Sequence, residues 1–231
     1  MTANDRVLIV AAHPDDEVLG CGGTAAWHSD AGDAVHVLIM AEGATARAGE
    51  SKGDFKHELS ALRAAAEQAA GVLGTEAPEF VGFPDNRMDS VSLLEVTKRI
   101  EQTITNARPT VVYTHHGGDL NVDHQIVHQA VLIACRPVPG SSVRAIYTFE
   151  TVSSTEWASP DDDEAFRPTR FVDVSGQMKR KLEALGAYGM EMRPPPHARS
   201  LENVSALATH RGASVGLKAA EAFMVVRERV E

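Results

Sequence analysis

The chain of 231 residues is poor in the features that mark secreted and membrane proteins. Its two cysteines, Cys21 and Cys135, are too few for a disulfide framework or a thiolate metal cluster. It has no uninterrupted run of about 18 apolar residues, which a membrane-spanning helix would require. The N-terminal segment Met1–Arg6 lacks the basic stretch, apolar run and cleavage site of a secretory signal. We therefore expect a protein of the reducing cytoplasm without a membrane partner.

Basic charge is also scarce. The chain has 22 Lys and Arg against 32 Asp and Glu, which gives a net charge of −10, and it contains no long basic block. Nucleic acids and anionic membranes bind concentrated basic surfaces, so neither is an expected partner. With 43% hydrophobic and 23% charged residues, the chain has an ordinary globular composition and the length for one sizeable core. We expect one domain over residues 1–231, and the sequence leaves homo-oligomer formation open.

Apolar runs alternate with helical patterns along the first two thirds of the chain. Strands are predicted at Val7–Ala12, Val35–Met40, Glu79–Phe83, Thr110–Thr114, Ala145–Glu150 and Ala222–Arg227. Helices are predicted at Glu17–Ser29, Phe55–Leu73, Ser92–Ala107, Val122–Cys135, Ser175–Tyr188 and Ser200–His210. Such alternation implies right-handed crossovers. We predict a single-domain, Rossmann-like α/β fold with a mostly parallel sheet flanked by helices. Its C-terminal third is elaborated by an acidic loop, Ser159–Glu164, and a proline-rich segment, Arg193–Pro196.

A first polar cluster follows the first predicted strand, and the carboxyl ends of strands are where open α/β sheets build their sites. It joins one imidazole, His13, to the carboxylates Asp15, Asp16 and Glu17, which are costly to bury together without a cation. His13 and Asp16 offer one nitrogen and one oxygen ligand, and Pro14 stiffens the turn between them. Taken alone, the segment could equally be a solvated loop whose aspartates favour a helix N-terminus.

A second polar cluster, His115–His124, follows the strand Thr110–Thr114. Four of the ten histidines fall between positions 115 and 128. Loops at the ends of two parallel strands can meet over the sheet edge, and a third ligand from here would complete a catalytic zinc site with three protein ligands. Nitrogen and carboxylate ligands without a thiolate favour Zn²⁺, with Fe²⁺ or Co²⁺ as alternatives.

The two clusters read AHPDDE (Ala12–Glu17) and NVDH (Asn121–His124). In this they resemble the LmbE-like, or PIG-L-like, zinc deacetylases, which carry AHPDDE near the N-terminus and HxDH downstream. The likeness extends over nearly the whole chain, through GCGGT (Gly20–Thr24), AEG (Ala41–Gly43), GFPDNRM (Gly82–Met88) and AEAF (Ala220–Phe223).

The resemblance implies that zinc binds to His13, Asp16 and His124 and that Asp15 is the general base. It also implies the reaction, which removes an N-acetyl or other N-acyl group from an amino sugar, glycoside, sugar nucleotide or related small metabolite. The expected partner is therefore a small N-acylated substrate.

One position departs from the family pattern, because Asn121 stands where HxDH begins with histidine. An amide can donate a hydrogen bond to a developing oxyanion but cannot deliver a proton at neutral pH. The proton then comes from Asp15 or from His115 or His116. We favour His116, since the neighbouring Gly117 gives it more freedom to face the site; the alternative is a surface histidine beside a turn.

Two other functions compete with the deacetylase. The chain could be a non-catalytic metal-binding or regulatory protein that lost its acid at Asn121. It could also be a dinucleotide-dependent oxidoreductase, because Gly20–Gly23 followed by Glu42 mimics a dinucleotide fingerprint. Here, however, HPDDEVL separates the glycines from the strand, so we expect them inside the helix, where they allow close packing on the sheet.

The sequence allows a functional and a structural interpretation of several other side chains. His128 is expected to pack or hydrogen-bond near the site rather than bind metal. Asp85 and Asn86 either reach substrate hydroxyls or form an ordinary turn. Arg199, like Arg193, Arg211 and His197, either binds a substrate anion or is a surface or helix-end charge.

Overall fold

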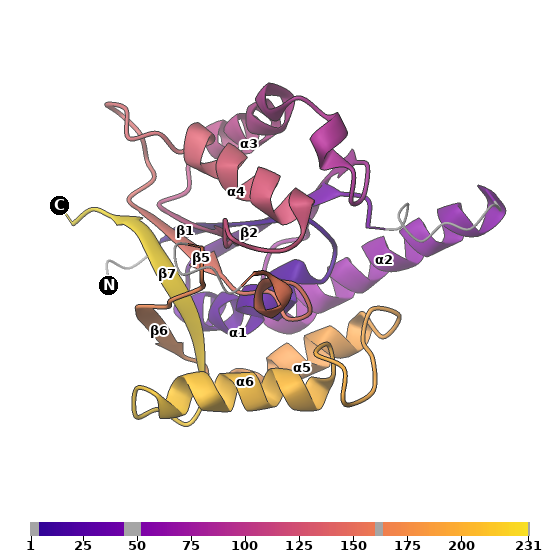
Figure 1. The fold of residues 1–231 in the computed structure, drawn as a ribbon. Coiled ribbons are helices and arrows are strands. Elements are labelled where there is room, and N and C mark those ends of the chain that lie inside the picture. The colour runs from indigo at the N-terminus through magenta and orange to yellow at the C-terminus, as the bar shows by residue number, and fades with distance from the viewer. Residues whose placement is uncertain (1–4, 44–51, 160–163, 231) are drawn as a thin grey trace.

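The computed structural model describes residues 5–43, 52–159 and 164–230, arranged around a seven-stranded sheet in the order β3-β2-β1-β4-β5-β7-β6 (Figure 1). The strands β1 to β5 pair with one another in parallel, and β7 is antiparallel to both β5 and β6. Their bounds are β1 (Arg6–Ala11), β2 (Ala34–Ala41), β3 (Glu79–Phe83), β4 (Val111–His115), β5 (Ala145–Phe149), β6 (Arg170–Asp173) and β7 (Ala220–Glu228). The predicted, mostly parallel α/β fold is confirmed.

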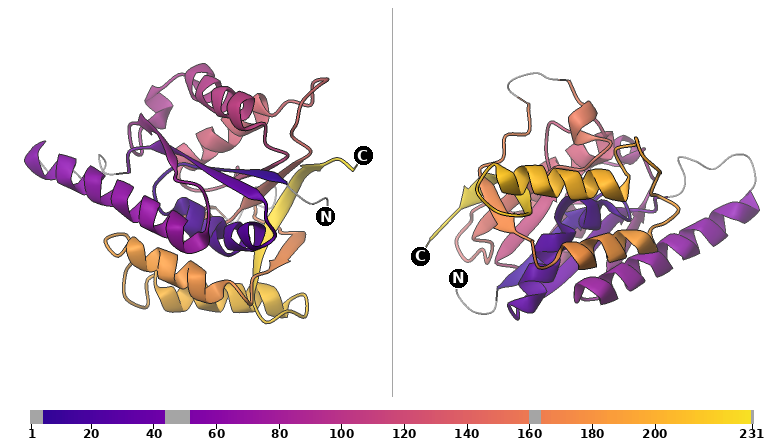
Figure 2. Two further views of the ribbon diagram at one scale, coloured as in Figure 1. Left: turned by 180° about the vertical axis from the view of Figure 1, so that it is seen from behind. Right: turned by 90° about the horizontal axis from the view of Figure 1, so that it is seen from below.

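Helices cover both faces of this sheet. Figures 1 and 2 show α3 and α4 on one face and α1, α2 and α5 on the other, with α6 beside α5. The helices are α1 (Asp16–Asp30), α2 (Lys52–Leu73), α3 (Leu93–Ala107), α4 (Val122–Ala134), α5 (Met178–Ala187) and α6 (Leu201–Ala213), with 3₁₀ turns η2 (Met88–Ser90) and η3 (Thr155–Trp157). Among the described residues, no helix has the length and apolar character needed to cross a bilayer.

The central strand β1 explains why the sheet has two cores. Its side chains alternate between the faces, so Val7 and Ile9 join the core under α1, α2, α5 and α6. Leu8 and Val10 join the core under α3 and α4. All four are at most 1% exposed, as the uninterrupted apolar run predicted.

The C-terminal third contains the feature that the sequence did not predict. β6 has only four residues, Arg170–Asp173, of which Val172 alone is buried, so its sequence carries no clear alternation. It forms one edge of the sheet by pairing with the start of β7. The predicted acidic loop Ser159–Glu164 lies largely outside the described residues, which do not include positions 160–163.

The glycine-rich segment lies inside α1, as predicted, and not at its N-terminus. α1 begins at Asp16, four residues before Gly20. A Cβ atom on Gly20 would lie 2.2 Å from the ring of Phe149 on β5, so this glycine lets the helix approach the sheet. The arrangement is unlike a dinucleotide-binding turn, in which the glycines precede the helix.

Gly20→Ala is expected to lower the free energy of unfolding by about 1–3 kcal/mol, because the added methyl group overpacks the contact with Phe149. Gly71→Ala in α2 is a matched control, since its Cβ would meet no atom within 4 Å and should stabilise the helix by about 0.5–1 kcal/mol. Urea unfolding of both variants measures the difference. Equal effects at the two positions would contradict the close approach of α1 to β5.

Candidate metal centre

Three side chains meet at the carboxyl ends of β1 and β4. His13 and Asp16 lie in the turn after β1 and at the start of α1, and His124 lies in the first turn of α4. Asp16 Oδ2 is 3.2 Å from His13 Nδ1 and 3.2 Å from His124 Nε2. The structure thus brings together the two sequence clusters, although Asp16 and His124 are 108 positions apart in the sequence.

The donor set fits a divalent metal ion. Ligand atoms bound to tetrahedral zinc at about 2.0–2.2 Å lie roughly 3.3–3.5 Å apart, close to the separations found here. Asp16 Oδ1 and His124 Nε2 are buried and have no hydrogen-bond partner among the described residues. Since an unsatisfied buried polar atom is costly, a cation between the three side chains would give His124 Nε2 the partner that it lacks.

Asp123 orients the first imidazole. Its Oδ2 atom lies 3.0 Å from His13 Nε2, and its two carboxylate oxygens accept hydrogen bonds from the backbone amides of Asn86 (2.7 Å) and Met88 (2.8 Å). Asp85 Oδ1 lies 3.2 Å from the same His13 nitrogen. If His13 carries its proton on Nε2, this N–H donates a hydrogen bond to these carboxylates, and the unprotonated Nδ1 faces Asp16.

Asp119 orients the second imidazole, that of His124. Its Oδ1 atom lies 3.1 Å from His124 Nδ1, close enough for an ion pair although the N–H is not aligned for a hydrogen bond. Asp119 is itself held by the hydroxyls of Ser154 and Thr155, the latter at 2.6 Å. The carboxylate therefore favours a proton on Nδ1 and leaves Nε2 of His124 facing Asp16.

The surrounding carboxylates make the metal-free cluster attract positive charge. Burial alone would lower the pKa of His13, but its hydrogen bonds to Asp123 and Asp16 outweigh burial and raise that pKa to about 10. Burial would also lower the pKa of His124, but Asp16 and Asp119 outweigh burial and raise that pKa to about 8. A metal must displace these protons, so its affinity should fall as the pH falls.

Asp119→Asn is expected to weaken metal binding by about 10- to 100-fold, the usual effect of removing a carboxylate that orients a ligating histidine. Competition with a chromophoric chelator measures the change. Asp89→Asn, at an exposed position of η2, is the control. Wild-type affinity in Asp119→Asn would show that Asp119 does not orient His124.

His115 packs against the ligand cluster. It is fully buried, and its ring stacks on that of His124 with centroids 3.8 Å apart. Its Nε2 atom accepts a hydrogen bond from the backbone amide of Ala12 at 2.9 Å. Burial and the neighbouring His124 hold the pKa of His115 well below its ordinary value. It is therefore a neutral acceptor that fixes the end of β1. His128 Nδ1 donates a hydrogen bond to the His115 carbonyl oxygen at 2.9 Å, which confirms the prediction that His128 packs or hydrogen-bonds near the site.

The two candidates for proton transfer and oxyanion binding lie in the loops beside the cluster. His116 is buried, with Nε2 2.7 Å from the carbonyl oxygen of Glu164 and its ring edge-on to Phe166. Asn121 caps α4, because its Oδ1 atom accepts a hydrogen bond from the amide of Asp123 at 2.8 Å. Its Nδ2 group donates to Asn86 Oδ1 at 2.8 Å. The Asn121 side chain thus already has a local structural role.

Asp15 is buried at the edge of the cluster and paired with an arginine from the C-terminal third. It is 1% exposed, has a left-handed backbone (φ 110°), and its Oδ2 atom lies 2.6 Å from Arg199 Nη1. Burial, with help from Asp16 and Glu191, raises the pKa of Asp15 well above its usual range although Arg199 opposes the rise. Arg199 is therefore neither a free surface charge nor an unpaired anion site.

Sequence reasoning named His13, Asp15, Asp16 and His124 but missed the residues that orient them. Asp119 and Asp123 lie five positions and one position before His124. A metal-bound histidine almost always donates its second N–H to a carboxylate or carbonyl, so their position was a usable signal. The Arg199–Asp15 pair spans 184 positions, and no local pattern reports it.

Comparison with known proteins agrees with the motifs. Residues 8–135 match the family model PIG-L, described as GlcNAc-PI de-N-acetylase. The uncharacterized deacetylase YaiS of Escherichia coli (strain K12) is 32% identical over 192 residues, which cover 80% of this chain and 91% of the relative. A 1D-myo-inositol 2-acetamido-2-deoxy-alpha-D-glucopyranoside deacetylase of Mycobacterium sp. (strain JLS) is 27% identical over 236 residues, covering 84% and 77%.

Solved structures share the fold. An N,N′-diacetylchitobiose deacetylase of Pyrococcus horikoshii superposes with a TM-score of 0.77 at 20% identity, covering 96% of this chain and 84% of that one. The 4-carboxy-2-hydroxymuconate hydratase GalB of Pseudomonas putida KT2440 gives 0.75 at 24% identity, covering 98% of each chain. At such identities the likeness concerns the fold alone, and these two proteins carry out different reactions on it.

Proposed function

Because the chain belongs to the PIG-L family of de-N-acetylases, we propose that it is a metal-dependent N-deacetylase acting on an acetylated amino sugar, free or within a glycoside. The observation that carries the proposal is the buried group His13, Asp16 and His124, in which His124 Nε2 has no hydrogen-bond partner among the described residues, with Asp15 beside it. The names of the relatives support the substrate class, since the mycobacterial protein acts on an acetamido sugar linked to inositol.

In this proposal His13, Asp16 and His124 hold Zn²⁺, with Fe²⁺ or Co²⁺ as alternatives. A bound zinc ion supplies Lewis acidity and lowers the pKa of water toward ~7. Asp123 and Asp119 fix the two imidazoles, so that the ligand atoms face one another before the metal arrives. Asp15 takes the proton of the attacking water, and Arg199 holds the Asp15 carboxylate in position.

The amine that leaves needs a proton, which Asn121 cannot provide. We retain His116 as the donor, with Asp15 as the alternative. His116 Nε2 is placed to donate to the Glu164 carbonyl, which would fix the ring and leave Nδ1 as the atom that exchanges a proton. Asn121 would act through its amide N–H on the developing oxyanion.

His116→Gln is expected to lower kcat by roughly 10²-fold or more, because it removes a general acid. Asn121→His, which restores the family histidine, should recover part of the lost rate in the His116→Gln background. His115→Gln and the remote His36→Gln serve for comparison on the same identified substrate. An unchanged kcat in His116→Gln would leave Asp15 to carry the proton alone.

The function itself is tested with a panel of N-acetylated amino sugars and their glycosides, with and without added zinc. The proposal expects equal amounts of acetate and free amine from at least one member of the panel, with loss of both on chelation. A protein that binds metal but releases no acetate would be the non-catalytic member of the family considered from the sequence.

A further inference from the structure

Asp15 has a backbone conformation that is unusual for its place in the fold. It precedes α1 as the N-cap residue, with φ 110° and ψ −29°, and a non-glycine residue rarely adopts such a positive φ. An aspartate at an N-cap usually has an extended backbone and caps the helix with its carboxylate. The Asp15 side chain makes no cap bond to the described residues of α1. Strain of this kind persists only where the surroundings hold it, and it clusters at functional sites.

Hydrogen bonds hold the peptide groups on both sides of Asp15. Its carbonyl oxygen accepts the amides of Val18 at 3.0 Å and Leu19 at 2.8 Å, which begins the hydrogen bonding of α1. Its amide donates to Glu17 Oε2 at 3.0 Å. A glutamate in the first turn that reaches back to the N-cap amide is half of a capping box. Asp15 does not supply the other half, so its backbone is fixed while its carboxylate is left for another partner.

Glu17 is itself held by a tyrosine from the C-terminal third. Tyr188, the C-cap residue of α5, donates its hydroxyl to Glu17 Oε1 at 2.6 Å. Glu17 is 4% exposed and Tyr188 is 0% exposed. Each carboxylate oxygen of Glu17 therefore has one donor, and burial strengthens both bonds because water does not screen them.

A buried ion pair anchors α5 to α1 and so fixes the place of Tyr188. Lys181 Nζ donates to the carbonyl oxygen of Leu19 in α1 at 2.9 Å and pairs with Glu221 of β7 at 2.6 Å. Both charged side chains are buried. Lys181 and Tyr188 thus attach α5 to the first turns of α1 at two points.

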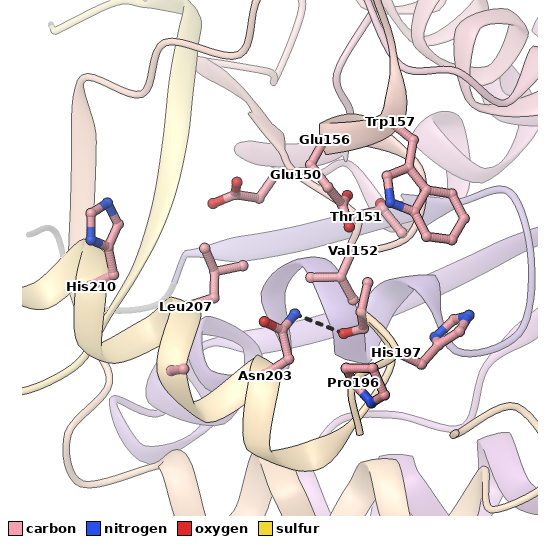
Figure 3. Close-up of a pocket in the computed structure, with 12 residues that line it drawn as sticks. Glu150, Thr151, Val152, Glu156, Trp157, Pro196, His197, Asn203, Leu207 and His210 are labelled. Carbon is pink, nitrogen blue, oxygen red and sulfur yellow. Dashed lines mark hydrogen bonds between the residues drawn. The ribbon is translucent and has the colours of Figure 1, made fainter. Parts of the chain in front are cut away.

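The Asp15 carboxylate is held separately, by Arg199, whose Nη1 atom lies 2.6 Å from Asp15 Oδ2. The chain around Arg199 is fixed by its neighbours. Its amide donates to His197 Nδ1 at 3.0 Å. Figure 3 shows the other bond, in which Asn203 Nδ2 donates to the carbonyl oxygen of Ala198 at 2.8 Å. Two parts of the C-terminal third therefore act on Asp15, one on its backbone and the other on its side chain.

We propose that Glu17 and Tyr188 are positioning residues, which hold the strained backbone of Asp15 and thereby set the direction of its carboxylate. Glu17 accepts the Asp15 amide directly, and Tyr188 acts only through Glu17. The proposal rests on the proposed function for its consequence, since Asp15 is the base of that reaction. Because neither side chain is assigned to the substrate or the metal, loss of either should lower kcat while KM and bound metal stay nearly unchanged.

The kinetic test uses metal-replete protein and the best substrate of the acetylated amino-sugar panel. Glu17→Ala should lower kcat by roughly 10- to 100-fold, the effect of a misplaced catalytic group. Glu17→Gln should keep most of the rate, since its amide oxygen can still accept the Asp15 N–H. Tyr188→Phe should lower kcat by roughly 3- to 10-fold in the wild type and have no further effect in the Glu17→Ala background. Tyr113→Phe is the matched control and should keep kcat, because it also removes a buried hydroxyl, one bonded with His28 at 3.0 Å.

Hydrogen exchange separates this proposal from the proposed function, because it needs no turnover. The Asp15 amide, followed by NMR, should exchange about 10-fold faster or more in Glu17→Ala, and measurably faster in Tyr188→Phe. The Gly23 amide, which donates to the buried carboxylate of Glu221 at 2.8 Å, is the internal control, since a loss of overall stability would expose both amides. Unchanged exchange of the Asp15 amide in both variants, or wild-type kcat in Glu17→Ala, would overturn the proposal. If the wild type releases no acetate, the proposed function fails, and the exchange rates still decide whether Glu17 and Tyr188 hold Asp15.

Discussion

Asp15→Asn should retain its metal and lose turnover by about 10²–10⁴-fold, the usual contribution of general acid–base catalysis. The substitution removes the proton acceptor but keeps the shape of the side chain. Its amide oxygen can still accept the hydrogen bond that Arg199 Nη1 makes at 2.6 Å. The expected defect is therefore in kcat, with the fold and the ligands His13, Asp16 and His124 in place.

Elemental analysis and kcat are measured on the same preparation of Asp15→Asn. Asp30→Asn is the matched control, because Asp30 also pairs with an arginine, Arg180 at 2.6 Å, but lies at the far end of α1. Near-normal turnover in metal-replete Asp15→Asn would assign the base to another residue.

His13→Ala and His124→Ala should each lose most of the metal and nearly all activity. Each removes one of three proposed ligands, and it leaves Asp16 as a buried carboxylate with one fewer partner. The loss should be more complete at low pH, because the remaining histidine keeps its proton there, consistent with the raised pKa values of about 10 for His13 and about 8 for His124.

Metal content is measured after dialysis against metal-free buffer, with circular dichroism to show that the variants fold. His36→Ala is the control, since His36 lies on β2 and pairs with Glu76 at 2.7 Å on the surface. Full metal occupancy in both His13→Ala and His124→Ala would contradict the ligand assignment.

The fold was predictable because its central strands are buried on both faces. Runs such as VLIVAA, at Val7–Ala12, have no polar interruption, and only a covered parallel sheet accommodates several of them with helices between. β6 was not predictable, because Arg170–Asp173 is stabilised by pairing with β7 and carries little pattern of its own. The reversed direction of β7 also depends on the connections through α5 and α6, which the strand sequence does not encode.

The candidate site was predictable to the extent that its residues cluster in sequence. His13, Asp15 and Asp16 share the turn after β1, and Asp119, Asn121 and His124 lie between the end of β4 and the first turn of α4. The contact of Arg199 with Asp15 instead joins the residue before Ser200, the N-cap of α6, to the turn after β1, 184 positions away, and no local pattern encodes it.

Metal stoichiometry and acetate release, followed together, test the central claim most directly. The chelator-treated protein is titrated with zinc, and bound metal and acetate released from the best substrate of the panel are measured at each step. We predict that both rise in parallel and stop at one zinc per chain. Acetate release that is unaffected by chelation, or one bound zinc per chain with no acetate from any acetylated amino sugar, would contradict the account.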